Sequence, residues 1–338
     1  MASPVFNKYD LISEENLILI DIIINCACLN IFAMFGIMGN ILNVIILRKQ
    51  GLRDSTNLTL MSLSMVDLAY GVVMPVRRAQ CVVSKFDVIL AQNFDVFINV
   101  YLVVPARILS FISSGHIVLI SLERTVAVYF PIKAASLLTV PRTVLCLVLI
   151  YLFWLILMSP FAQIFAVDTF LNSESNRTFY MITFSAFLVD NWEVINIINV
   201  FVLATIRGPV SFSIIALASV SIGYRLQEAR VKRQEMTSWK SKASFDTKVA
   251  RMLLVVCLVY LALAFPSNIP TLMYFIDDTF LMYQGRTTSM YTVSEYLVDL
   301  LYVVNSAVNF LIYVTMSRKF HRTYKSLVRG CQRMFSQT

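Results

Sequence analysis

Charged residues are scarce in this chain. Asp, Glu, Lys and Arg make up 14% of its 338 residues, whereas 58% of the residues are apolar. A soluble domain usually carries about 25% charged residues, and a chain with so few could not cover a folded globule with polar surface. The deficit excludes a soluble globular enzyme. Intrinsic disorder is excluded as well, because the apolar and aromatic residues supply ample material to bury.

Histidine, glycine and cysteine are also few. The sequence has two His residues, and neither has a metal-ligating neighbour at a usable spacing, so no enzyme is indicated. We expect His116 to be a packed residue within a helix. Nine Gly without a repeat exclude collagen, and six Cys spread over the whole length exclude a disulfide scaffold.

Apolar residues, by contrast, form long continuous stretches. A helix that crosses the hydrocarbon core of a membrane, about 30 Å thick, needs about 20 mostly apolar residues. The stretches that reach this length are residues 22–47, 58–76, 97–129, 143–165, 197–224, 249–276 and 293–314. None alternates apolar and polar residues as a membrane β-strand does. The sequence therefore predicts an all-α fold, a seven-transmembrane helix bundle over residues 22–314.

The distribution of basic residues predicts the orientation of this bundle. The net charge is +8, and most of the 28 Lys and Arg residues fall on one side, mainly within residues 225–251 and 318–333. Because short basic loops stay in the cytoplasm, we expect residues 1–21 to be an extracellular tail and residues 315–338 to be cytoplasmic, with the bundle in the plasma membrane. The lipid bilayer and a cytosolic partner account for the basic surplus, so nucleic acid is not needed to explain it.

A second kind of helix is predicted after the last span. Phe320, Tyr324 and Leu327 recur at helical spacing, while Lys and Arg take the opposite face. This pattern is typical of a short amphipathic helix that lies in the membrane interface. Cys331 follows it directly and could carry a palmitoyl chain as a second anchor, or could remain a reduced thiol.

The outer loops carry two further signals. Asn176, followed by Arg177 and Thr178, forms a glycosylation acceptor in the expected extracellular loop after the fourth span. Cys81 is the one cysteine expected near an extracellular loop, since the others fall within spans or on the cytoplasmic side. We therefore expect no disulfide between outer loops.

One carboxylate falls inside the membrane. An ionisable residue within a spanning helix costs several kcal/mol unless it finds a partner, so it points to function. Asp67 lies midway along the second expected span, and polar residues of other spans fall at similar depth. These are Asn40, Ser113, Asn305, Ser306 and Asn309. Together they could hold a small hard cation through oxygen ligands, or they could form a hydrogen-bonded packing network around a protonated Asp67.

A second charged group is expected at the cytoplasmic end. Glu123 and Arg124 are adjacent at the end of the third span, and Asp246 begins the sixth on the same side. A bidentate pair between Arg124 and these carboxylates would pin the sixth helix against the third. The alternative is a static interface salt bridge of little energetic value.

Several short motifs occur in a fixed order along the chain. They are Gly39-Asn40, the polar run 57–68 with Asp67, Glu123-Arg124, Trp154, Pro209, Pro266, and Asn309 to Tyr313. With these motifs the chain resembles the rhodopsin-like (class A) G-protein-coupled receptors over nearly all of its length.

The resemblance implies a receptor that binds an extracellular small molecule or peptide and activates a heterotrimeric G protein by outward movement of helix 6. It implies a resting-state sodium ion at Asp67, Ser113, Asn305 and Asn309, and no other cofactor. The residues that the resemblance assigns to G-protein coupling and the switch are Glu123, Arg124, Asp246 and Tyr313.

The chain also departs from the family pattern. The helix 6 tryptophan is absent from the run 260–266, and Leu217 stands in place of the helix 5 tyrosine. Phe310 replaces the helix 7 proline, and Asn99 stands where helix 3 usually has a cysteine. These departures alter the residues that would carry a signal through the bundle, and they leave the coupling end mostly intact.

The ligand site is expected near the outer ends of the spans. Ala106 stands where amine receptors of the family carry an aspartate, which argues against a monoamine. Arg77, Arg107 and Arg207 could converge there on an anionic ligand group, or their stems could snorkel to the lipid headgroups. Acidic residues of the outer rim, such as Asp299, would instead attract a basic peptide.

Two ligand classes remain open within the same fold. The second and seventh spans look most like invertebrate orphan receptors of the chemosensory and neuropeptide groups. We favour the chemosensory class, because an outer loop without a disulfide gives a large peptide little fixed structure to contact. A membrane transporter or channel is the alternative of a different class. Such chains often carry inverted repeats, and none is visible here.

Overall fold

The computed structural model describes residues 9–172, 177–199, 205–235, 243–277, 282–283 and 286–335. Within this part of the chain, seven helical segments are long and apolar enough to cross a membrane, which confirms the predicted bundle. In chain order they contain α1 (Glu14–Asp21), η1 (Ile22–Cys28) and α2 (Leu29–Gln50); α3 (Ser55–Arg77); α5 (Val88–Tyr129); α7 (Val140–Met158) and η2 (Ser159–Gln163); η4 (Ile206–Val210) and α10 (Ser211–Glu235); α11 (Ala243–Ser267); and α13 (Ser289–Met316).

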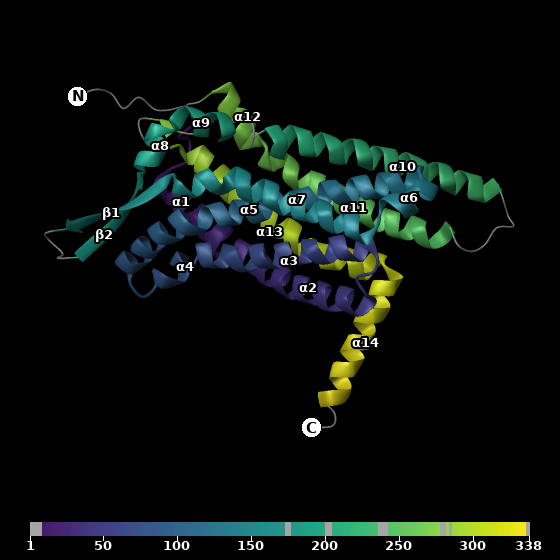
Figure 1. Ribbon diagram of the computed structural model, residues 1–338. Helices are drawn as coiled ribbons and strands as arrows, with labels where there is room; N and C mark the ends of the chain where they lie inside the picture. Colours follow the sequence, from purple (N-terminus) through teal and green to yellow (C-terminus); the bar gives the residue numbers. More distant parts are fainter. Residues whose placement is uncertain are drawn as a thin grey trace.

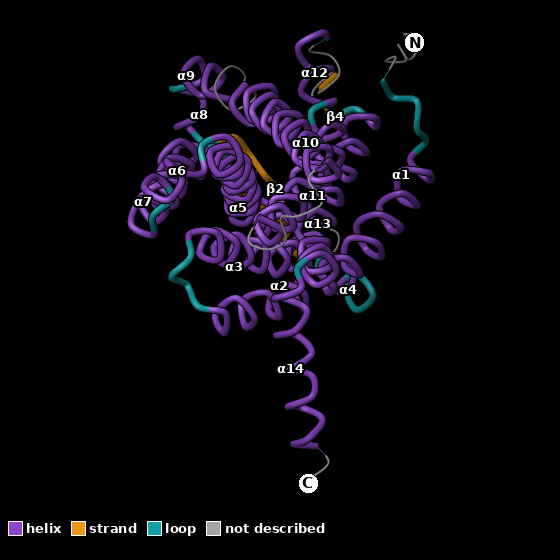
Figure 2. The backbone as a smooth tube through the Cα atoms, turned by 90° about the vertical axis from the view of Figure 1, so that its right-hand side faces the viewer, coloured by secondary structure: helices purple, strands orange, loops and turns teal. Residues whose placement is uncertain are grey.

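Short elements connect these segments. They are α4 (Gln80–Val83), α6 (Pro131–Leu137), β1 (Phe165–Asn172), β2 (Arg177–Phe184), α8 (Ala186–Asp190), α9 (Trp192–Ile197), α12 (Ile269–Ile276), β3 (Met282–Tyr283) and β4 (Arg286–Thr287). The predicted amphipathic helix is α14 (Arg318–Phe335), which leaves the bundle at the end opposite the β1–β2 hairpin (Figure 1) and projects away from the bundle (Figure 2). We call the end with the hairpin the outer end and the end with α14 the inner end.

Two helices, the first and the third, begin about two turns earlier than the apolar stretches predict. The first begins at Glu14, where the Ser13 hydroxyl accepts the Asn16 N–H at 3.4 Å. The third begins at Val88, where the Asp87 carboxylate accepts the N–H groups of the next helical turn at 2.9 and 3.1 Å. Capping side chains determine where a helix begins, so a hydropathy threshold misses these more polar first turns.

The outer end carries a β-hairpin that the sequence analysis missed. β1 and β2 pair antiparallel, from Phe165 opposite Phe184 to Asn172 opposite Arg177. Asn93 of α5 holds β2 in place, since its amide donates to the Thr178 carbonyl at 2.9 Å and accepts the Tyr180 N–H at 3.0 Å. Two runs rich in β-branched and aromatic residues around a polar segment are the signal that could have predicted it.

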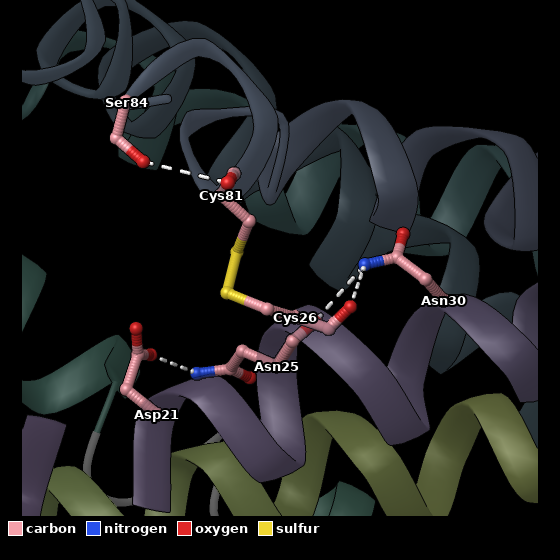
Figure 3. The surroundings of a disulfide bond; sticks show 6 residues. All are labelled: Asp21, Asn25, Cys26, Asn30, Cys81 and Ser84. Atoms are coloured by element: carbon pink, nitrogen blue, oxygen red, sulfur yellow. Dashed lines mark hydrogen bonds between the residues drawn. A yellow bond between two sulfur atoms is a disulfide. The ribbon is translucent and has the colours of Figure 1, made fainter. Parts of the chain in front are cut away.

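The outer end also contains a disulfide, so the prediction for Cys81 is wrong. Cys26 in η1 and Cys81 in α4 are bonded, with their Cα atoms 5.6 Å apart (Figure 3). Cys26 had been placed inside the first span. Because that helix begins at Glu14, about two turns earlier than predicted, Cys26 lies close enough to the outer end to meet α4. Asp21 and Asn25, one turn before it, are joined by a 2.6 Å hydrogen bond.

The inner end is held mainly by apolar packing. Buried side chains of α2, α3, α5, α10, α11 and α13 form one cluster, which includes Leu63, Ile120, Leu253 and Tyr313. Phe320 from the first turn of α14 is buried in the same cluster. The amphipathic helix is therefore fastened to the bundle at its start.

Phe310 occupies a crowded position in α13. Its ring makes edge contacts with Phe320 and Tyr324 of α14, at 6.2 and 5.8 Å between centroids. A Cβ on Gly39 of α2 would lie 2.9 Å from the Phe310 Cβ, so glycine is what lets the two helices approach. α13 contains no proline and runs unbroken from Ser289 to Met316.

Candidate functional site

The polar residues predicted around Asp67 meet in the middle of the bundle. The Asp67 carboxylate is buried and accepts hydrogen bonds from the Ser113 hydroxyl and the Asn309 amide, each at 2.8 Å. Ser306 donates to the Asp67 carbonyl at 3.0 Å. Asn40 donates in turn to the Ser306 carbonyl at 3.1 Å. The network therefore joins α2, α3, α5 and α13.

Asn305 is the exception among these residues. It is buried next to Ser306, but its side chain takes no part in the hydrogen bonds that surround Asp67 in the described structure. The position of Asn305 in the sequence predicted its depth in the bundle, but it could not predict the direction of the side chain.

The Asp67 site has oxygen atoms that suit a small hard cation. Besides the carboxylate and the Ser113 hydroxyl, the Ser64 hydroxyl is buried and finds no hydrogen-bond partner within the described part of the chain. Ser64 lies three residues before Asp67 and so on the same face of α3. Within that part, no group of three or more His, Cys, Asp or Glu side chains is arranged so that it could hold a metal ion, so hydroxyl and amide oxygens would complete the coordination at Asp67.

His116 belongs to a separate buried network. One ring nitrogen lies 2.8 Å from the Ser62 hydroxyl and the other 2.7 Å from the Ile112 carbonyl. The Tyr151 hydroxyl is 3.2 Å from the same Ser62 oxygen. This arrangement links α3, α5 and α7, and it agrees with the prediction of a packed helix residue.

At the inner end, Glu123 and Arg124 contact neighbouring helices through hydroxyl groups. Arg124 donates to the Thr56 hydroxyl of α3. The Glu123 carboxylate accepts from Thr59 of α3 and Thr143 of α7, both at 3.4 Å. These contacts fix the end of α5 against α3 and α7. The sequence analysis did not single out Thr56, although its place in the first turn of α3, beside the Asp54 cap, was a signal.

Several predicted residues have side chains outside the described residues. The backbone of Asp246 lies in α11, that of Cys331 in α14 and that of Arg207 in η4. Asn176 lies outside the described residues altogether. The pairing of Asp246 with Arg124, the modifications of Asn176 and Cys331, and the ligand role of Arg207 stay predictions.

Tyr313 can be described fully. Its side chain is buried in the inner cluster, and its ring packs edge-on against Phe320 at 5.8 Å. Its hydroxyl finds no hydrogen-bond partner within the described structure. Tyr313, which is predicted to take part in the switch, thus places its own hydroxyl among apolar neighbours.

At the outer end, the arginines and the acidic residues pair with each other. Arg77 and Arg78 donate to the same Asp299 oxygen, at 3.2 and 2.9 Å. Arg107 pairs with Glu295 at 3.5 Å, and both of these side chains are substantially exposed. Ala106 is buried among apolar residues of α2, α3 and α13. The sequence analysis treated the basic and acidic sets as signals for opposite ligands, because it could not show that α3 and α5 pair with α13.

Further charged groups surround the Arg77 and Arg78 pair. Asp95 of α5 interacts electrostatically with both guanidinium groups, and Asn99 is its hydrogen-bonding neighbour. The Arg78 guanidinium lies over the Tyr296 ring, 5.5 Å from its centroid. Asp21 of α1 is a hydrogen-bonding neighbour of Tyr296. We call this group the outer ionic cluster; its members are Asp21, Arg77, Arg78, Asp95, Tyr296 and Asp299.

Comparison with known proteins agrees with this architecture. The chain matches the family described as 7 transmembrane receptor (rhodopsin family) over residues 39–313. It is also 25% identical to an FMRFamide receptor of Drosophila melanogaster over 303 residues, which cover 88% of this chain and 52% of that protein. The chain thus spans about half the length of this relative.

Proposed function

Because this chain belongs to the rhodopsin family of seven-transmembrane receptors, we propose that it binds an extracellular peptide and activates a heterotrimeric G protein. The family and the seven apolar helices make it a multi-pass membrane receptor, not an enzyme. The observation that carries the proposal is the family match over residues 39–313, which includes both the Asp67 network and Arg124.

A neuropeptide is the ligand class that we propose. The relative is named an FMRFamide receptor, and the reason that favoured a chemosensory ligand has weakened. That reason was the expectation of an outer surface without fixed structure. The outer surface of the structure is instead ordered by a disulfide, by a hairpin that Asn93 holds in place, and by a docked N-terminal segment. In that segment the Asp10 carboxylate accepts the Ser289 N–H at 2.8 Å. The chemosensory alternative stays a prediction.

We propose that the switch is a movement of the inner end of α11 away from α5. Apolar contacts of α11 with α10 and α13 hold it in the present conformation, together with the predicted Asp246 restraint on Arg124. An agonist that prefers the conformer with α11 displaced would shift the population toward it. Arg124 and Tyr313 would then contact the G protein.

The orientation in the plasma membrane is part of the proposal. The basic face of α14 supports a cytoplasmic inner end, because Lys and Arg near a span favour the cytoplasmic leaflet. The hairpin and the N-terminal segment would then be extracellular.

We also propose that Asp67, Ser113 and Asn309 hold a sodium ion in the resting receptor. The buried carboxylate would supply the negative charge, and hydroxyl and amide oxygens would supply the remaining ligands. Asp67→Asn should remove any dependence of agonist affinity on sodium concentration. Agonist binding measured in sodium and in choline buffers tests this. An equal sodium effect in both proteins would contradict the site.

A cell assay tests the peptide receptor function. Cells with a promiscuous G protein would express the chain and be exposed to amidated peptides including FMRFamide, to small acids and to odorants. We expect a peptide to activate the G protein, and Arg124→Ala to abolish the response at equal surface expression. A response to odorants alone would favour the chemosensory class. Solute flux in proteoliposomes without nucleotide exchange would favour a transporter or channel.

A further inference from the structure

The outer ionic cluster has unused hydrogen-bonding atoms of both kinds. Arg77 Nε and Arg78 Nε are buried N–H donors without a partner among the described groups. Asp95 Oδ1 is a buried acceptor that likewise has no partner there. The side chain of Arg77 is only 9% exposed. Leaving such atoms unpaired costs about 1–3 kcal/mol each, so the cluster is a place where a ligand can gain hydrogen bonds.

The charges of the cluster restrict what such a ligand can be. Three carboxylates accompany two guanidinium groups, and Asp299 is shared by both of the latter. An anionic ligand would add a fourth negative charge and would place only acceptors against Asp95. A cationic ligand would place only donors against the two Nε–H groups. A neutral group with an acceptor and donors side by side meets both needs.

A primary carboxamide is such a group, since its oxygen accepts two hydrogen bonds and its nitrogen donates two. We propose that the outer ionic cluster binds the terminal carboxamide of an amidated peptide. The carboxamide oxygen accepts from Arg77 and Arg78, and its nitrogen donates to Asp95. This inference rests on the proposed peptide receptor function and names the chemical group by which the ligand is recognised.

The cluster can be reached from the outer end. The Asp299 side chain is 20% exposed, and Asp95 is half-buried. The unused atoms themselves are buried, so the proposed contact requires the side chains around them to move. The disulfide between Cys26 and Cys81 joins η1 to α4 beside this cluster, since Asp21 and Arg78 each precede a bonded cysteine by no more than two helical turns.

Two peptides that differ only at the C-terminus test the inference. Each amidated peptide of the cell assay, with FMRFamide as the first, is compared with its free acid. In the wild-type receptor we expect the amide to be at least about tenfold more potent, because the free carboxylate offers no donor to Asp95 Oδ1 and places a like charge beside it. Equal potency of amide and acid would overturn this inference and leave the proposed function standing.

Substitutions locate the effect in the cluster. Asp95→Asn should raise the potency of the free acid and reduce the preference for the amide to about threefold or less. Asp95→Glu keeps the carboxylate and should keep most of the preference. Asp190→Asn, which removes an exposed carboxylate of the same outer end, is the matched control and should change nothing.

The remaining outcomes are also decisive. An unchanged preference in Asp95→Asn at normal surface expression would place amide recognition elsewhere and overturn the inference. A wild-type receptor that reaches the surface and responds to neither form of any peptide would contradict the proposed peptide function, and this inference with it.

Discussion

The outer and inner ends of the bundle are stabilised by different interactions. At the outer end a disulfide joins η1 to α4, and ion pairs of 3.2 and 2.9 Å join Arg77 of α3 and its C-cap residue Arg78 to Asp299 of α13. At the inner end, apolar contacts and hydroxyl hydrogen bonds predominate, such as those of Glu123 with Thr59 and Thr143. Apolar contacts can be exchanged for one another at small cost, whereas a disulfide and buried ion pairs cannot. The comparison places the rigid frame at the end where we propose that a ligand binds and the adaptable packing at the end where we propose that a G protein binds.

Removal of the disulfide should have the largest effect. Cys26 and Cys81 are 55 residues apart in sequence, and a cross-link over such a loop contributes up to about 4 kcal/mol in the chain-entropy account. We expect the double variant Cys26→Ala/Cys81→Ala to unfold at a clearly lower temperature in detergent. Cys146→Ala removes an exposed free thiol and serves as the control. Equal melting temperatures for the two variants would show that the outer frame does not depend on the cross-link.

Substitution of two glycines in the fifth spanning segment compares the stability of packing at the two ends directly. A Cβ on Gly208, near the outer end, would lie 2.6 Å from Asn268 Oδ1. The Asn268 amide is held by the Ala264 carbonyl at 2.7 Å. Gly208→Ala should therefore cost about 1–3 kcal/mol. Gly223, near the inner end, has open space around its Cβ position, so Gly223→Ala should be neutral or stabilise by up to about 1 kcal/mol.

Thermal unfolding of both variants measures this difference. The double variant Gly208→Ala/Asn268→Ala should recover most of the loss, because it removes the atom that the new methyl group meets. Similar melting temperatures for Gly208→Ala and Gly223→Ala would contradict the expectation that the fifth spanning segment is packed more tightly at the outer end than at the inner end.

Loss of the Thr56 hydroxyl should affect signalling more than stability. Thr56→Val removes an acceptor of Arg124, and a restraint of about 1 kcal/mol corresponds to a rise of up to about fivefold in ligand-free signalling. Asp246→Ala should raise basal activity as well if its carboxylate restrains Arg124. Thr125→Val is the control, because the Thr125 hydroxyl donates to the backbone carbonyl of Ser121 within the same helix at 2.9 Å. Basal nucleotide exchange that is unchanged in both test variants would argue against a restrained Arg124.

The smallest effect is expected at Asp87, through pH. The N–H of Leu90, then that of Ile89 and the Arg177 guanidinium, hold the pKa of the exposed Asp87 carboxyl below its ordinary value. Its stabilising contribution is therefore complete above the unfolded pKa of about 3.9 and is lost as pH falls through the lower folded value. The protection factor of the amides at the start of α5, which is the intrinsic exchange rate at each pH divided by the observed rate, should fall in this acid range. In Asp87→Asn this protection factor should no longer change there. A similar acid dependence in both proteins would assign the change to another group.

The sequence predicted the spans and the middle of the bundle well. Long apolar stretches suffice to locate membrane helices, and a carboxylate such as Asp67 cannot stay there without partners. Helix rise alone gave depths close enough to select Ser113 and Asn309, both of which contact it at 2.8 Å. The motifs around these residues then identified the family.

The outer end could not be predicted in the same way. Whether Cys26 meets Cys81 depends on a helix start that is set by the Ser13 cap and not by hydropathy. Whether Arg77 meets Asp299 depends on the rotation of two helices about their axes, and a count of charges does not contain that information. Sequence patterns of a single chain record which faces are apolar, but they leave the pairing of polar groups between helices open.

The unbroken α13 has a mechanical consequence. A helix without a proline joint bends little, so a shift at one end is delivered to the other about 40 Å away at the usual rise per residue. Near the inner end of α13, Phe310 packs against Gly39 on one side and against the rings of Phe320 and Tyr324 of α14 on the other. If a ligand bound at the proposed outer site tilted α13 near Asp299, the ring contacts of Phe310 would transmit that tilt to α14. The angle of α14 to the membrane would then report on the occupancy of the outer site.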